Sequence, residues 1–233
     1  MLSILFLGFL TGLQHALEAD HLAAVASLAT RSRGLAETAR QGAAWGLGHT
    51  LMLLLFGGAV LFMDQLVPGQ LATGLEMAVG IMLVLLGADV LRRLWLEGVH
   101  FHAHHHGPVA HFHAHSHLPG ILHAADPHRH GHAARLPARA LLVGMVHGLA
   151  GSAALILLAL QTVHDVWLGL LYILIFGVGS IAGMALLAAA ISLPLRWSAR
   201  SLTWAHNGLK ASVGLLTFGI GLHIALSRAA ELG

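Results

Sequence analysis

The sequence has no cysteine and few charged side chains. The absence of cysteine excludes disulfide bonds and thiolate metal sites. Only 9% of the 233 residues are charged, whereas a soluble domain has about 25%. This leaves too little polar surface for a chain that meets water on all sides. The formal net charge of +2 gives the chain no polyelectrolyte character, and we expect no nucleic-acid partner.

Long apolar runs take the place of the missing polar surface. Hydrophobic residues make up 57% of the chain, and runs of about 20 residues, the length that crosses a bilayer, recur along it. These runs do not alternate between apolar and polar residues, as the strands of a membrane barrel would. We therefore predict an all-α integral membrane protein in contact with the lipid bilayer. Its six transmembrane helices are expected at 2–28, 41–63, 71–95, 138–161, 166–193 and 203–226.

Arginine marks alternate loops between the predicted spans. The loops after the first, third and fifth spans hold ten arginines, while the loops around 64–70 and 162–165 hold no Lys or Arg. The ten are Arg31, Arg33, Arg40, Arg92, Arg93, Arg129, Arg135, Arg139, Arg196 and Arg200. By the positive-inside rule these loops face the cytoplasm. Both termini are then expected outside an inner or plasma membrane.

The two halves of the sequence resemble each other. The matches are GLQH (12–15) with GMVH (144–147), 46–55 with 177–187, and 74–87 with 208–221. They align His15 with His147, Gly46 with Gly177 and Gly74 with Gly208, in the same order and at nearly one spacing. An alternative is chance similarity between glycine-rich apolar helices. A three-span repeat inserts its second copy upside down, and inverted repeats are typical of transporters that bind substrate near the midplane.

This repeat divides the chain into three parts. We expect a first transmembrane repeat over residues 1–97 and a second over 137–233. A cytoplasmic histidine-rich loop over 98–136 is expected to join them. Within the repeats, glycines four residues apart are typical of seams where two helices approach closely in lipid. The pairs are Gly8 with Gly12, Gly42 with Gly46, Gly144 with Gly148, and Gly179 with Gly183.

Four polar residues interrupt the first predicted span, in the stretch GLQHALEADHLAAV. They are His15, Glu18, Asp20 and His21. An ionisable group at the bilayer centre costs about 2.5–3.5 kcal/mol on insertion scales, so such residues usually face a cavity and mark an ion path. The alternative is a set of structural ion pairs or hydrogen bonds that tie helices together.

The spacing of these residues constrains the geometry of any site. On a regular helix His15 lies about 140° from Asp20 and about 120° from His21, so one small ion cannot reach all three. Either the helix unwinds between His15 and Asp20, or other spans complete the site. His49 is the best candidate on the second span. His147, which aligns with His15, is the best candidate on the fourth.

Imidazole and carboxylate ligands without sulfur suit borderline divalent metals such as nickel, cobalt and zinc. We therefore predict His15, Asp20, His21 and His49 as metal ligands. Glu18 and His147 are predicted as further metal or pathway residues.

Thirteen of the twenty histidines lie between residues 100 and 132. Glycine, proline and a lack of apolar periodicity predict a segment that is disordered without ligand. Dense imidazoles chelate divalent metals loosely, although a solvated linker without a role is the alternative. The residues predicted to capture metal are His102, His104, His105, His106, His111, His113, His115 and His117.

The stretch from His15 to His21 resembles the H-x4-D-H signature of the nickel/cobalt transporter family. Leu47-Gly-His49-Thr resembles the second conserved stretch of that family, and GMVHGLAGSAAL at 144–155 resembles its urease-accessory-like six-span branch. The larger members have eight spans and an acidic signature in the later half, which the fourth span here lacks. The resemblance implies secondary transport of Ni²⁺ or Co²⁺, with His15, Asp20, His21 and His49 handling the metal. It also implies a cytoplasmic metallochaperone or nickel-enzyme maturation system as partner.

We accordingly predict a permease without a catalytic cofactor, for which Ni²⁺ or Co²⁺ is the transported substrate, most simply by uptake. Efflux of the same ions, or metal binding by a membrane accessory protein without transport, are the alternatives. An enzyme is the remaining rival, because HALEAD also satisfies the H-x4-D pattern of glycerolipid acyltransferases, in which histidine acts as base. That motif belongs to a soluble interfacial domain, which this sequence does not contain.

The predicted topology is tested with a single cysteine, since the native chain has none. In the Ala103→Cys variant the new thiol lies in the predicted cytoplasmic loop. An impermeant thiol reagent should leave it unmodified in intact cells and modify it after permeabilisation. Modification in intact cells would place this loop outside the membrane and reverse the predicted topology.

Overall fold

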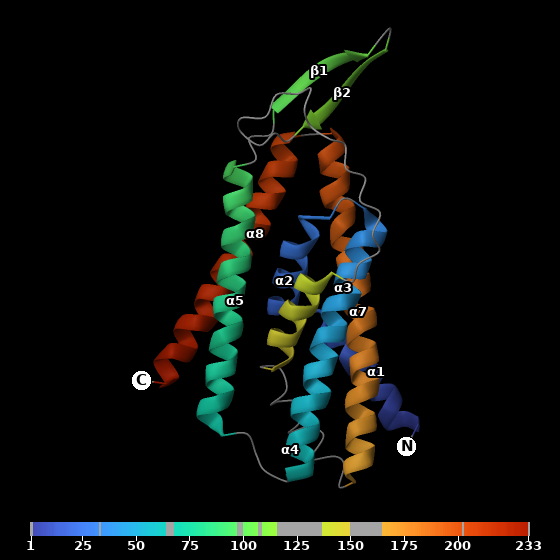
Figure 1. Ribbon diagram of the computed structural model, residues 1–233, viewed down its shortest axis with the longest axis vertical. Helices are drawn as coiled ribbons and strands as arrows, with labels where there is room; N and C mark the ends of the chain where they lie inside the picture. The colour runs from blue at the N-terminus through green and yellow to red at the C-terminus, as the bar shows by residue number, and fades with distance from the viewer. Residues whose placement is uncertain are drawn as a thin grey trace.

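The computed structural model describes residues 2–32, 34–63, 68–96, 100–106, 109–115, 137–149, 165–201 and 203–232 (Figure 1). The helices are α1 (Leu2–His15), α2 (Ala19–Ala29), α3 (Leu35–Met52), α4 (Gly58–Met63), α5 (Gly69–Leu96), Ala138–Leu149, α7 (Val166–Ser201) and α8 (Thr203–Leu232). A short π-helix, η1 (Leu53–Gly57), joins α3 to α4. The two strands are β1 (His100–His106) and β2 (Val109–His115).

The prediction of an all-α membrane protein is confirmed. Four continuous helices are long and apolar enough to cross a bilayer, and they match the second, third, fifth and sixth predicted spans. The first predicted span consists of two helices, α1 and α2. The fourth is described over Ala138–Leu149, and the rest of that predicted span, 150–161, lies outside the described residues.

The histidine-rich loop differs from the expectation of disorder over part of its length. Strands β1 and β2 form an antiparallel pair in which His100 lies opposite His115 and His104 opposite His111. In both strands histidine recurs at every second position, which is the period of a β-strand and not of a helix. The loop expected at 98–136 therefore begins with a hairpin, and residues 116–136 lie outside the described residues.

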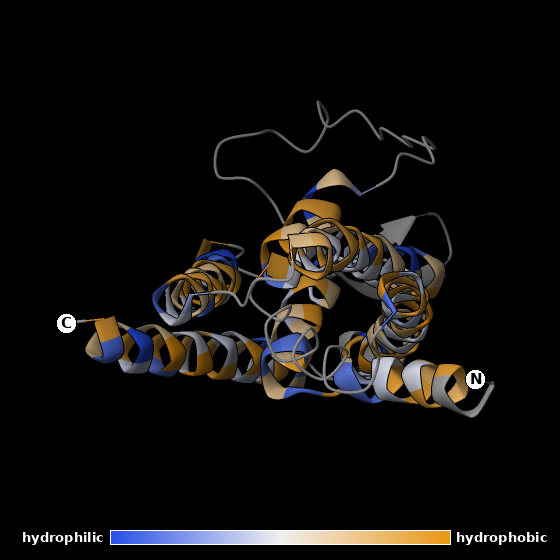
Figure 2. Cartoon of the chain, turned by 90° about the horizontal axis from the view of Figure 1, so that it is seen from below, coloured by the Kyte–Doolittle hydropathy of each residue, from blue (hydrophilic) through white to orange (hydrophobic). Residues whose placement is uncertain are grey.

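Hydrophobic residues recur along the helices of the bundle (Figure 2), and many of them are exposed. Large hydrophobic side chains such as Phe6, Leu85 and Leu216 are more than 60% exposed. Four tryptophans are also exposed and lie near helix ends, where tryptophan meets the membrane–water interface; they are Trp95, Trp167, Trp197 and Trp204. A surface of this kind is expected to face lipid.

Helix α2 lies at the centre of the bundle (Figure 1). Its residues Val25 and Leu28 share a buried cluster with Trp45 of α3, Leu83 of α5 and Met184 of α7. Around it, α5 packs along α8, while α7 packs against both α1 and α3. The apolar part of α2 is therefore packed among α3, α5 and α7.

The glycine pairs of the sequence form helix seams, as predicted. A methyl group on any of the eight paired glycines would lie less than 3.0 Å from an atom of a neighbouring helix. Gly144 faces the carbonyl of Trp45, and Gly12 faces the carbonyl of Phe176. In the alignment of the two halves, Gly12 corresponds to Gly144 and Trp45 corresponds to Phe176. These are the contacts that two related halves would make, while the boundaries of the two repeats stay a prediction.

Three arginines gather around one carboxylate at one end of the bundle. Asp89 of α5 pairs with Arg31, which follows α2, and its Oδ2 lies 3.3 Å from Arg93 Nε and 3.6 Å from Arg139 Nη2. Arg139 belongs to the helix Ala138–Leu149. The arginines of two predicted cytoplasmic loops thus meet on the same side.

We expect the close approach of the helix Ala138–Leu149 to α3 to depend on Gly144. In Gly144→Ala the added methyl would meet backbone as well as the Trp45 ring, and overpacking of this kind costs about 1–3 kcal/mol. Its thermal unfolding midpoint in detergent should fall below that of the native chain.

Gly74→Ala is the matched control, because Gly74 also lies in a helix but has nothing within 4 Å of the added methyl. It should leave the midpoint unchanged or raise it, since alanine favours helix over glycine. Equal midpoints for the two variants would contradict the tight seam.

Candidate metal-binding site

The first predicted span breaks at its polar residues. Helix α1 ends at His15 and α2 begins at Ala19. Between them Leu17 N–H donates to Gln14 O (2.9 Å) and Glu18 N–H donates to His15 O (3.1 Å). Glu18 is extended, with φ −62° and ψ 149°. This confirms the prediction that the helix departs from regular geometry between His15 and Asp20.

The break brings together histidines that a straight helix would separate. The ring centroids of His15 and His21 are 4.3 Å apart, and the His49 ring of α3 lies 5.2 Å from the first and 5.3 Å from the second. One ligand atom from each of the three residues lies within 4.8 Å of the others. The second span thus contributes to the same cluster, so both options left open by the angular argument occur together.

His147 completes the cluster from the helix Ala138–Leu149. Its ring centroid lies 4.1 Å from that of His21, and a ligand atom of each lies within 4.8 Å of an Asp20 oxygen. The imidazoles are shielded from solvent, with exposures of 1% for His21, 0% for His49 and 1% for His147, and 10% for the His15 side chain. We refer to His15, His21, His49 and His147 as the histidine cluster.

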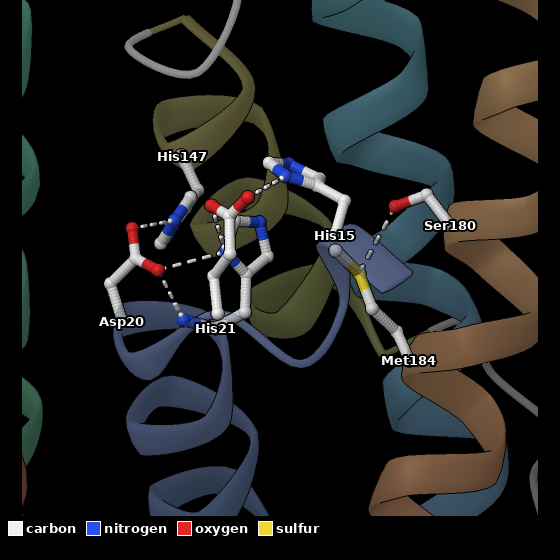
Figure 3. Close-up of polar contacts among 7 residues, drawn as sticks. His15, Asp20, His21, His147, Ser180 and Met184 are labelled. Carbon is white, nitrogen blue, oxygen red and sulfur yellow. Dashed lines mark hydrogen bonds and ion pairs between the residues drawn. The ribbon is translucent and has the colours of Figure 1, made fainter. Parts of the chain in front are cut away.

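The carboxylate of Asp20 holds two of these rings (Figure 3). Oδ1 accepts hydrogen bonds from the His21 backbone N–H (2.8 Å) and from His21 Nδ1 (3.0 Å). Oδ2 lies 3.0 Å from His147 Nε2. An ionised carboxylate only accepts, so both rings donate to it. Asp20 therefore assigns the tautomer of each ring, the arrangement in which a carboxylate orients a metal-binding histidine.

Glu18 plays the same part for His15. Its Oε1 lies 2.8 Å from His15 Nδ1, which donates, while its side chain is 56% exposed. Glu18 Oε2 lies 4.0 Å from His21 Nδ1, beyond hydrogen-bond distance. Glu18 was predicted as a metal or pathway residue, and its position lies at the edge of the cluster.

These hydrogen bonds leave the second ring nitrogen of His15, His21 and His147 without a proton. Among the described residues, no hydrogen-bond partner is present for His15 Nε2, His21 Nε2, His147 Nδ1 or either ring nitrogen of His49, one of which carries the proton of the neutral ring. A buried polar atom left unpaired costs about 1–3 kcal/mol. Several such nitrogens in one place are a fit for a divalent cation that accepts imidazole ligands.

The predicted loop histidines do not join this cluster. Figure 1 places β1 and β2 beyond the ends of α5, α7 and α8, at the far end of the molecule. Seven of the eight lie in the hairpin, while His117 lies outside the described residues. Any metal capture by these histidines is separate from the cluster.

Two aromatic rings beside the cluster were not predicted from the sequence. The Trp45 ring lies 5.4 Å from those of both His21 and His147, and the Phe176 ring lies 5.2 Å from that of His15. Trp45 is one helical turn before His49, a spacing that puts both on one face and could have revealed it. Phe176 is the repeat counterpart of Trp45 when Gly46 is aligned with Gly177.

The second half of the chain lacks a counterpart of His49. The aligned position holds Ser180, which donates to the sulfur of Met184 at 3.9 Å (Figure 3). Both residues are fully buried in α7. The histidine cluster therefore draws three imidazoles from the first half and one from the second.

The chain is similar to one curated protein, the urease accessory protein UreH of Bacillus sp. (strain TB-90). The two are 36% identical over 224 residues, which covers 96% of this chain and 90% of that protein. No protein-family model and no solved structure matches the chain.

The bridging role of Asp20 predicts the effect of Asp20→Asn. An amide offers one acceptor and one NH₂ donor, so it cannot accept from both His21 and His147, and one ring must change its tautomer or lose its partner. Loss of such an orienting carboxylate typically weakens metal affinity about 10–100-fold. We expect that loss for Ni²⁺ in calorimetric titrations of detergent-solubilised protein.

The control is Glu231→Gln, which neutralises an exposed carboxylate at the end of α8. Its affinity should equal that of the native chain. An unchanged affinity in Asp20→Asn would mean that Asp20 does not set the ring tautomers.

Proposed function

We infer that this chain, which belongs to the UreH family of urease accessory proteins, carries Ni²⁺ or Co²⁺ across the membrane through the histidine cluster. Urease is a nickel enzyme, and a membrane protein that assists it has a nickel-related role. Uptake fits this role, because it supplies the ion to the cytoplasm where the enzyme is matured. The cytoplasmic partner would be a metallochaperone or the maturation system itself.

One observation carries the proposal. Four imidazoles shielded from solvent present unpartnered nitrogens at the break between α1 and α2, within the first predicted span. Broken helices near the midplane are where secondary transporters bind their ions. A purely structural cluster would instead be expected to satisfy its ring nitrogens within the protein.

The donor set supports a borderline metal. Imidazole nitrogens with nearby carboxylates suit nickel and cobalt, and also zinc. Zinc favours a closed tetrahedral site, whereas nickel and cobalt accept more ligands, such as water or a carboxylate oxygen. The position of Asp20 beside His21 and His147 leaves a carboxylate available at the edge of the cluster.

The division of the cluster between the two halves supports a transport cycle. His15, His21 and His49 belong to the first half, and His147 belongs to the second. Movement of one half against the other would change the distance between His147 and the other three rings. Such a displacement would weaken the site and release the ion, as alternating access by rocking repeats requires.

The arrangement of charges supports the proposed orientation. Arg31, Arg93 and Arg139 meet at Asp89, on the side assigned to the cytoplasm by the positive-inside rule. The histidine-rich hairpin follows α5 at that same end (Figure 1). With both termini outside, its imidazoles would receive the imported ion.

Flux measurements in proteoliposomes test this function, with Ni²⁺, Co²⁺ and Zn²⁺ in competition. His21→Ala should abolish flux, because His21 contacts Asp20 and its ring lies beside those of the other three histidines. Deletion of residues 100–132 should leave kcat largely intact and raise the apparent KM. Many weak imidazole sites raise the local concentration of metal, and that effect matters only when metal is scarce.

Leu226→Ala is the control, since Leu226 is exposed on α8 and is not part of the histidine cluster. Metal binding in detergent without flux in proteoliposomes would point to a non-transporting accessory protein. Flux that survives in His21→Ala but disappears in the loop deletion would mean that the loop, and not the cluster, is essential for transport.

A further inference from the structure

We propose that a cavity between α2 and α8 is the path by which the ion reaches the histidine cluster, and that His223 is a ligand on this path. The proposal rests on the proposed function and adds a residue and a route to it. The cavity has a volume of about 550 Å³. Six waters occupy about 180 Å³ at about 30 Å³ each, so a hydrated divalent ion fits.

Asp20 connects the cavity with the cluster. Together with Ala19 it forms the α2 wall of the cavity, while its two oxygens contact His21 and His147. The Asp20 side chain is 26% exposed, whereas those of His21 and His147 are 1% and 2% exposed. An ion in the cavity would therefore meet the carboxylate before it meets the imidazoles.

His223 lies on the opposite wall. It is exposed and lines the cavity within an otherwise apolar segment of α8, between Leu215 and Ile224. An ionisable side chain within a membrane-length helix is expected to face a water-filled space and not lipid. Imidazole is also the ligand type of the cluster itself.

The helix register places His223 further from the centre of the bundle than Asp20. Thr217 Oγ1 donates to Ala23 O at 3.1 Å, and α2 and α8 run in opposite directions (Figure 1). Asp20 is then level with Ile220, and His223 lies three residues further along α8. At about 1.5 Å per residue this is about 4.5 Å beyond the carboxylate along the helix axis.

The position on α5 that aligns with His223 lies toward the other end of the bundle. Asp89 of α5 is the repeat counterpart of His223 when Gly74 is aligned with Gly208. The helices α5 and α8 pack antiparallel through glycines, so Asp89 and His223 lie toward opposite ends; the contacts are Gly80 with Gly221 and Gly87 with Gly214. Asp89 is occupied by three arginines. Of these two aligned positions, the one that lines a cavity next to the cluster is therefore His223.

A path of this composition favours passage over retention. Apart from Asp20 and His223, its walls are apolar or small residues such as Leu216, Gly219 and Ile220. One imidazole and one carboxylate on facing walls hold a divalent cation more weakly than a set of several ligands would. The ion then moves on to the cluster, where more nitrogens converge.

The test uses His223→Cys, a unique thiol because the native chain has no cysteine. A positively charged methanethiosulfonate reagent needs a thiolate in water, so it should modify this thiol at least tenfold faster than that of Leu226→Cys. Leu226 is 62% exposed on the same helix but does not line the cavity. Added Ni²⁺ should slow modification of His223→Cys and leave Leu226→Cys unchanged.

Flux gives the second readout. His223→Ala should raise the KM for Ni²⁺ about 3–10-fold with kcat retained, while Leu226→Ala should match the native chain. Equal modification rates at the two cysteines would mean a lipid-filled groove and overturn the proposal. Fast modification that Ni²⁺ does not slow, or an unchanged KM in His223→Ala, would also overturn it. Because modification needs no transport, absence of flux in the native chain would count against the proposed function alone.

Discussion

The histidine cluster depends on the carboxylate of Asp20, which lies between two imidazole rings. Asp20 accepts hydrogen bonds from His21 and His147, which belong to different predicted spans and to different halves of the chain. It thereby fixes which nitrogen of each ring carries a proton and which is left free for a ligand. The helix breaks after His15, next to this carboxylate. Only an interrupted helix can present Asp20, His21 and His15 to one point.

This bridge is possible only because backbones approach closely around it. Gly144 packs on the carbonyl of Trp45, and Gly148 packs on the backbone of His49. Any larger residue would push the helix Ala138–Leu149 away from α3 and carry His147 out of reach of Asp20. In lipid, where apolar side chains gain little from leaving their solvent, such contacts supply much of the association between helices. The glycine seams and the polar bridge therefore support each other.

The sequence predicted the helical class, the break and the partnership of His15 and His21 with His49, because each follows from a simple constraint. Buried ionisable groups are costly in a bilayer, and helix periodicity limits which residues can face one point. The sequence alone could not show that Asp20 bridges two rings, since this depends on distances between spans. It also missed the walls made by Trp45 and Phe176. Likewise, the predicted disorder overlooked the alternation that pairs β1 with β2.

The free nitrogens of the histidine cluster have a chemical consequence for the ion. A nitrogen lone pair holds either a metal ion or a proton, so a divalent ion that enters displaces any protons bound there. When the ion leaves, the same nitrogens become basic again, with the carboxylate of Asp20 beside two of the rings. Metal binding and protonation thus exclude each other at the same nitrogen atoms. The affinity of the site for a divalent ion is therefore expected to fall as the proton concentration rises.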